Sequence, residues 1–303
     1  MNGAQSTAGL ALTSFATAAA AAALETALRP QPRRLFAPTG HAAAATRLSR
    51  ASALLAAAAL ADSGVEHYRG SFHNKNMILP LAVAAQALGA GLHGATDHAA
   101  RPNSTRDLAQ AVALVTGLVG TGFHFYNILK RPGGWSWLNL FYGAPIGAPF
   151  ALSLAGMLGG LAERLRSGRR AIYGLLPGQL IARLISFGLL GASGEAALMH
   201  FRGAYHNPAM VIPVTAPPVA AALLTGATVC PRFANTAAWS LKLLAAVGFI
   251  GAALHAYGIQ RNMGGWRNWS QNILNGPPLP APPAFTALAI AGLAALKLME
   301  TER

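Results

Sequence analysis

Six of the nine histidines form three pairs whose members lie 131 or 133 residues apart: His67 and His200, His73 and His206, His124 and His255. Imidazole nitrogens bind haem iron and other transition metals, and they exchange protons near neutral pH. Three pairs at nearly one spacing are not a coincidence. We therefore predict a duplicated site that is built on imidazole chemistry.

Charged side chains accompany the histidines in both copies. Asp62 and Glu195 each lie five residues before the first histidine of their copy. Ionisable groups in membrane helices are costly and usually face the bundle interior or a watery cavity, so both acids are candidates for proton handling or for supporting a metal ligand. Arg69 and Arg202 are duplicated too. They could bind a carboxylate or phosphate, extend to lipid headgroups, or pair with the acids.

Two kinds of metal site suit these residues. A haem b takes two imidazoles from different helices, and the chain offers two such pairs: His67 with His124, and His200 with His255. Met77 or Met210 could replace one axial ligand. A non-haem iron, copper or zinc ion would take two or three imidazoles and a carboxylate, with His73 and His206 as further ligands or proton carriers.

The histidines belong to a longer repeated string. Positions 67–80 match positions 200–213 at seven of fourteen residues. A second resemblance joins positions 124–145 to positions 255–278. The chain is therefore predicted to be a fused pair of similar halves.

Part of the string is predicted to form a turn between two helices. We expect Gly70 and Gly203 to end a helix with a positive φ angle, which glycine adopts without steric cost. Asn74 and Asn207 are expected to cap the helix that follows.

Composition places these halves in a membrane. Charged residues make up 11% of the chain, against roughly 25% in an average globular protein, and apolar residues fall in blocks of about 20. The net charge of +14 does not indicate nucleic acid, because the arginines stand at the ends of the apolar blocks. The partner expected from composition is the lipid bilayer. A single cysteine, Cys230, excludes an internal disulfide and a cysteine-based cluster made by this chain alone.

We predict an all-α polytopic membrane protein with about eight transmembrane helices, arranged as two tandem four-helix repeats. The spans are expected at 48–69, 76–97, 108–129, 145–162, 179–202, 208–229, 237–259 and 280–298. Residues 1–47 would be an Ala/Arg-rich leader, amphipathic or disordered, or an extra span. Residues 48–170 and 171–303 would be the two repeats. An even number of spans in each gives both the same, parallel orientation.

Lysine and arginine predict the sidedness. The excess lies on the side of the termini, which indicates cytoplasmic termini in a cell inner membrane. The first and third spans of each repeat then end at the outer face. All six paired histidines are expected there.

The function predicted from these features is haem or metal binding at a duplicated outer-face site, with a redox or electron-transfer role. A quinone or a soluble outer-face redox protein would be the partner. Electron transfer across the bilayer is not expected, because the paired histidines occupy one face only. Two alternatives stay open: a proton- or ion-coupled transporter or channel, and a membrane anchor subunit for an outer-face dehydrogenase.

Overall fold

The structure is a computed structural model that describes residues 39–97 and 101–302. The predicted leader lies outside these residues up to position 38. Within the described part the secondary structure is helical, apart from one isolated bridge between Ile172 and Leu175. The predicted all-helical fold is confirmed for these residues.

The described chain contains ten α-helices and four short 3-10 helices. The α-helices are α2 (Thr39–Arg69), α3 (Leu79–Thr96), α4 (Ser104–Leu129), α5 (Trp137–Phe141), α6 (Gly147–Arg166), α7 (Pro177–Arg202), α8 (Ile212–Val229), α9 (Ala234–Gln260), α10 (Trp269–Asn275) and α11 (Pro283–Thr301). The 3-10 helices are η1 (Lys75–Ile78), η2 (Pro208–Val211), η3 (Pro231–Phe233) and η4 (Gly265–Asn268). Residues 39–47, which were expected in the leader, form the first turns of α2.

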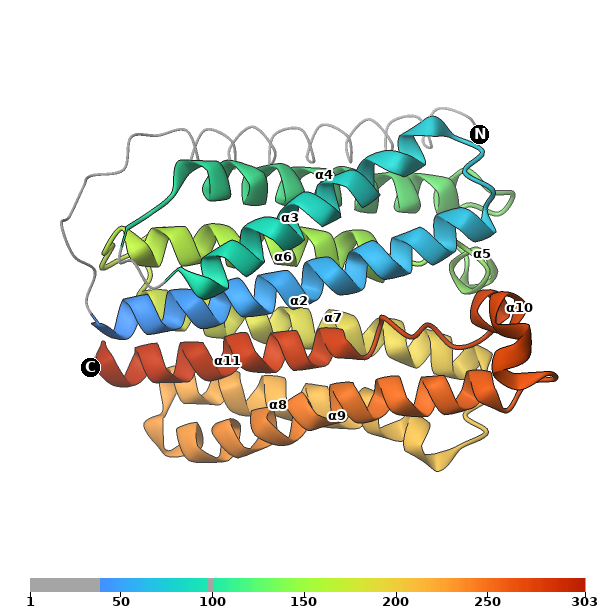
Figure 1. The fold of residues 1–303 in the computed structure, drawn as a ribbon. Helices are drawn as coiled ribbons and strands as arrows, with labels where there is room; N and C mark the ends of the chain where they lie inside the picture. Colours follow the sequence, from blue (N-terminus) through green and yellow to red (C-terminus); the bar gives the residue numbers. More distant parts are fainter. Residues whose placement is uncertain (1–38, 98–100, 303) are drawn as a thin grey trace.

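The long helices form one bundle in which α2 and α11 run side by side through the middle (Figure 1). α2 packs against α3, α6 and α11, and α6 packs against α4. α7 packs against α8 and α11, and α9 packs against α8 and α11. The short helices α5 and α10 lie at one end of the bundle (Figure 1). We call this the motif end, and we call the end where α2 begins and α11 finishes the terminal end.

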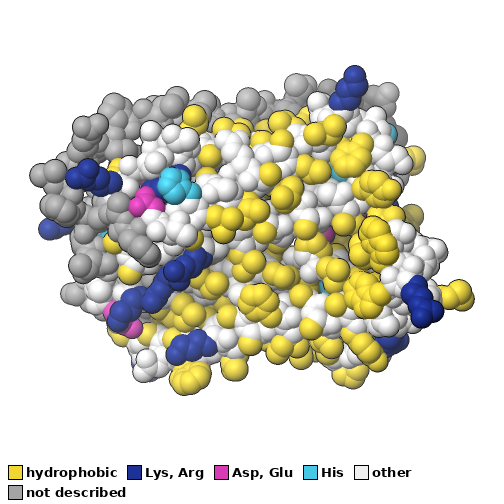
Figure 2. Space-filling model, in the orientation of Figure 1, with side chains coloured by type: hydrophobic (Ala, Val, Ile, Leu, Met, Phe, Trp, Pro, Cys, Tyr) yellow, Lys and Arg dark blue, Asp and Glu magenta, His cyan; other side chains and the backbone are white. Residues whose placement is uncertain are grey.

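Six of the described helices are long and apolar enough to cross a membrane: α4, α7, α11, and α3, α8 and α9 together with the 3-10 turns before them. Hydrophobic side chains spread over much of the visible surface, and lysine and arginine gather toward its ends (Figure 2). The chain is therefore a helical, multi-pass membrane protein. α2 and α6 fall outside this set because α2 carries Asp62, Glu66 and three arginines, and α6 contains several glycines and ends in Glu163, Arg164 and Arg166. Both pack mainly against other helices.

Glycine sets the closest helix crossings. A Cβ atom at Gly117 of α4 would overlap the backbone nitrogen of Ser153 on α6. A Cβ atom at Gly248 of α9 would overlap the hydroxyl of Thr286 on α11. Only glycine lets these helix backbones approach so closely.

An ion-pair cluster lies at the terminal end. It consists of three arginines and three carboxylates: Arg106, Arg164, Arg166, Asp97, Asp107 and Glu163. Oε1 of Glu163 accepts hydrogen bonds from Nε of Arg106 and Nη1 of Arg166, both at 2.8 Å. Arg106 also binds Asp97 at 2.6 Å, and Arg164 lies 3.3 Å from Asp107. The formal charges of the cluster cancel, so it joins α4 to α6 without needing a counter-ion.

Candidate functional site

The first histidine of each motif lies in the last turn of a helix, and the following segment fixes its ring. Nδ1 of His67, at the end of α2, is 2.7 Å from the carbonyl oxygen of Met77. Nδ1 of His200, at the end of α7, is 2.8 Å from the carbonyl oxygen of Met210. Both copies therefore hold the imidazole through the same nitrogen and the same backbone position.

The turn between each histidine and its acceptor has a left-handed backbone at two consecutive residues. Their φ angles are 57° at Ser71, 46° at Phe72, 55° at Ala204 and 48° at Tyr205. An L-residue pays about 1–2 kcal/mol for this conformation. Strain of this kind persists where the surrounding structure enforces it, commonly near functional sites.

The prediction that the motif glycines adopt positive φ is wrong. Gly203 has a φ of −83°, and Gly70 is not among the positive-φ glycines of the described chain. These glycines instead make room for a methionine. A Cβ atom would stand 3.3 Å from Cε of Met77 at Gly70, and 3.1 Å from Cε of Met210 at Gly203.

The strained turn brings an aromatic ring against each histidine. Phe72 meets His67 edge-on at a ring-centroid distance of 6.3 Å, and Tyr205 meets His200 in the same way at 6.2 Å. The exchange of Phe for Tyr between the copies preserves this contact. The turn therefore restrains the imidazole from two sides, through the hydrogen bond and through the ring.

Relief of the strain should be measurable as stability. We expect Ala204→Gly to raise the free energy of unfolding by roughly 0.5–1 kcal/mol, because the relief of about 1–2 kcal/mol exceeds the chain-entropy cost of glycine. Denaturant unfolding in detergent measures it. Ala209→Gly, in the neighbouring η2 helix, is the control and should lower stability. Equal losses of unfolding free energy in both variants would show that the turn is not strained.

The asparagine caps are confirmed. Oδ1 of Asn74 accepts the backbone N–H of Asn76 at 2.9 Å at the start of η1. Oδ1 of Asn207 accepts the N–H of Ala209 at 2.9 Å at the start of η2. These bonds begin the helix that returns from the motif end.

The histidines of α4 and α9 are fixed in the same manner. Nδ1 of His124 bonds to the carbonyl oxygen of Pro145. Nδ1 of His255 lies 2.7 Å from the carbonyl oxygen of Pro278. A carbonyl can only accept, so the hydrogen is on Nδ1 in all four rings, and in the neutral imidazole the lone pair is then on Nε2.

The structure brings together the histidines that were predicted to pair. The rings of His200 and His255 have centroids 6.4 Å apart and are inclined by 76°. His67 lies close enough to His124 to interact with it electrostatically. Metal–imidazole bonds are about 2.0 Å long. Two imidazoles that bind one ion from opposite sides therefore have ring centroids roughly 6 Å apart. The separation of the His200 and His255 rings is close to this spacing.

His73 and His206 are not part of these pairs. Both are exposed, and each bonds within its own turn, to the carbonyl oxygens of Gly70 at 3.1 Å and Gly203 at 3.0 Å. Within residues 39–97 and 101–302, no three His, Cys, Asp or Glu side chains lie close enough to hold a metal jointly. The described residues therefore place His73 and His206 apart from the other paired histidines.

The two acids lie on the helices that carry the first histidine of each motif, Asp62 on α2 and Glu195 on α7. Asp62 of α2 interacts electrostatically with Glu195 of α7, although the two belong to different copies of the motif. Glu195 faces the start of α6, where a Cβ atom at Gly147 would lie 3.0 Å from its Cγ. The carboxylate of Glu195 therefore lies against the backbone N–H groups of Ile146 and Gly147 at the start of α6. Ile146 is the N-cap residue of this helix, and its side chain makes no capping hydrogen bond.

The two arginines each reach across to a short helix of the other half. Nη2 of Arg69 donates to the carbonyl of Leu274 in α10, and Nη2 of Arg202 donates to the carbonyl of Leu140 in α5 at 3.3 Å. Arg69 also pairs with Glu66 at 2.6 Å. These contacts connect the halves, which is a role that the sequence analysis did not consider.

The helices α5 and α10 were not predicted, but a repeated residue marks them. Nδ2 of Asn139 donates to the carbonyl of Gly134 at 2.7 Å, and Nδ2 of Asn272 donates to that of Gly265 at 2.8 Å. Both asparagines are buried. Their equal spacing from His67 and His200, 72 residues in each copy, was the signal that could have located the short helices.

Comparison with known proteins gives no relative: no protein-family model, no curated protein and no solved structure matches this chain.

Proposed function

We propose that the chain crosses the membrane eight times, as two tandem four-helix repeats in parallel orientation. Equivalent contacts support this proposal. The four long helices of the first half make the same set of pairwise contacts as the four of the second half. In chain order, α2, α3, α4 and α6 correspond to α7, α8, α9 and α11. The paired histidines, the caps and the strained turns also have the same hydrogen bonds in both copies. The excess of basic residues at the terminal end favours a cytoplasmic location for that end.

We infer that each repeat binds a haem or a single transition-metal ion between two imidazoles at the outer face. His67 and His124 would be the ligands in the first repeat, and His200 and His255 those in the second. One observation carries the proposal: every one of these rings directs Nδ1–H to a backbone carbonyl. Histidines that bind metals are typically oriented in this way, because the bond fixes the tautomer that leaves Nε2 free.

The residues around each pair suit a redox role. A haem iron or a copper ion would supply one-electron chemistry there. The strained turns hold His67 and His200 in place before any ligand arrives, which limits reorganisation when the charge of the site changes. Asp62 and Glu195 are the acids available to take up protons nearby.

Reduction of the purified protein tests the redox role. We expect dithionite to change the visible spectrum and a soluble electron acceptor to restore the original one. A bound metal whose spectrum and oxidation state do not respond to either reagent would exclude electron transfer, even though the metal site itself would stand.

A proton-coupled transporter is the second candidate, and the presence of one carboxylate inside α2 and one inside α7, Asp62 and Glu195, favours it. Parallel-repeat transporters carry their substrate sites at the interface of the repeats. Proton-driven uptake by liposomes containing the protein would support this function, and a purely redox protein would show none.

A further inference from the structure

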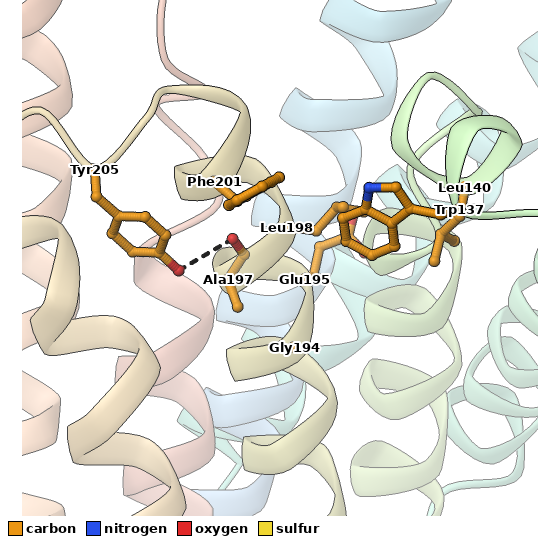
Figure 3. A pocket seen from close by; sticks show the side chains of 8 residues that line it. All are labelled: Trp137, Leu140, Gly194, Glu195, Ala197, Leu198, Phe201 and Tyr205. Carbon is orange, nitrogen blue, oxygen red and sulfur yellow. Dashed lines mark hydrogen bonds between the residues drawn. The ribbon is translucent and has the colours of Figure 1, made fainter.

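A groove of about 500 Å³ opens on the side of α7 near the motif end. Its lining comes from α7, from the turn that follows α7 and from α5 of the other half: Trp137, Leu140, Gly194, Glu195, Ala197, Leu198, Phe201 and Tyr205. In Figure 3, Trp137 and Tyr205 lie on opposite sides of the α7 residues. The groove therefore lies beside the second pair of histidines and spans the junction of the halves.

Three of the eight lining residues are aromatic: Trp137, Phe201 and Tyr205. Trp137 meets Phe201 edge-on at 5.9 Å, and Phe201 meets Phe141 of α5 at 5.8 Å. Trp137 and Phe201 keep 60% and 53% of their surface exposed. Such rings offer faces and edges to a flat ligand, and they favour offset or edge-on contacts with another ring.

Glu195 is the only ionisable carboxylate among the lining residues. It lies more than one helical turn inside α7, which ends at Arg202. A lipid chain would gain nothing from a carboxylate at this depth, where charge is costly. A ligand with a hydroxyl group would gain a charge-assisted hydrogen bond. The lining thus combines an apolar aromatic surface with one strong acceptor.

Tyr205 connects the groove to the histidine pair. Its ring packs against His200 at 6.2 Å, and its hydroxyl donates to the carbonyl of Ala197 at 3.2 Å (Figure 3). His200 in turn lies 6.4 Å from His255, measured between ring centroids. A ring in this groove would therefore be separated from a proposed metal ligand by one side chain.

We propose that this groove binds the head group of a membrane-soluble hydroquinone, with a ring hydroxyl donating to Glu195 and the ring packed against Trp137 and Phe201. The class of ligand follows from the lining: it must be lipid-soluble, flat and able to donate a hydrogen bond. The proposal rests on the proposed redox function, because oxidation of the bound hydroquinone requires the redox site to accept its electrons. Binding itself needs no metal.

Gly194 provides a sharp test, because a Cβ atom there meets nothing within 4 Å. Gly194→Leu should therefore fold normally and fill the groove. Gly64→Leu on α2 is the matched control, since a Cβ atom at Gly64 also meets nothing within 4 Å. We expect a decyl-substituted benzohydroquinone, titrated under nitrogen into full-length protein in lipid nanodiscs, to bind Gly194→Leu about tenfold more weakly or worse, and Gly64→Leu as it binds the wild type.

The dimethyl ether of the same compound tests the hydrogen bond. It keeps the ring and the chain but lacks a donor, so it should bind the wild type about tenfold more weakly than the hydroquinone. Equal binding of the two compounds, equal binding to both leucine variants, or no binding at all would overturn the proposal. Metal content is measured on the same samples, so loss of the metal site and loss of the hydroquinone site are distinguished.

Discussion

His255→Asn is expected to halve the metal or haem content of the protein, from about two to about one per chain. The asparagine amide can still donate to the carbonyl of Pro278, as Nδ1 of the imidazole does at 2.7 Å. The variant therefore keeps the bond that stabilises the fold and loses only the nitrogen that would bind the metal. His124→Asn should have the same effect on the first site, and the double variant should bind none. Elemental analysis and the absorption spectrum of purified protein measure the content.

The motif itself supplies the control. His206→Asn removes an exposed imidazole that bonds only to Gly203 in its own turn, so the metal content should not change. Full content in His255→Asn, or loss of content in His206→Asn, would show that the ligands have been assigned to the wrong histidines.

Glu163→Gln is expected to lower the free energy of unfolding by about 3–5 kcal/mol, the usual effect of breaking a buried ion pair. The carboxylate is 4% exposed and accepts hydrogen bonds from Arg106, Arg166 and the backbone N–H of Asn103. An amide there offers one acceptor oxygen in place of two and leaves both guanidinium groups without full compensation. Denaturant unfolding in detergent micelles measures the change.

Glu300→Gln makes the same chemical change at an exposed pair. Glu300 lies 2.6 Å from Lys297, and both side chains are more than half exposed. Surface ion pairs contribute little to stability, so the free energy of unfolding of this variant should stay within about 0.5 kcal/mol of the wild-type value. Comparable losses of unfolding free energy in the two variants would mean that the ion-pair cluster around Glu163 does not stabilise the fold.

Much of the fold could be predicted from the sequence, because hydropathy and repetition are local signals. The apolar blocks predicted the long helices, and the repeated asparagine predicted the helix caps at Asn74 and Asn207. The pairing of His200 with His255 followed from topology, since helices that run in the same direction end at the same face.

Other features depend on contacts that leave no local pattern. The left-handed turns at Ser71 and Ala204 are fixed by a methionine and an aromatic ring that fold back onto the helix end. The cluster around Glu163 exists in one half only, because the corresponding positions for Arg106 and Glu163 are Ala237 and Leu296. A search for repeated residues cannot find it.

Elemental analysis of the purified wild-type protein, together with its absorption spectrum, tests the central claim most directly. The account predicts iron or copper at about two atoms per chain, with a haem spectrum if the iron is carried by a porphyrin. Protein that contains neither metal in stoichiometric amount, after purification without chelators, would contradict it.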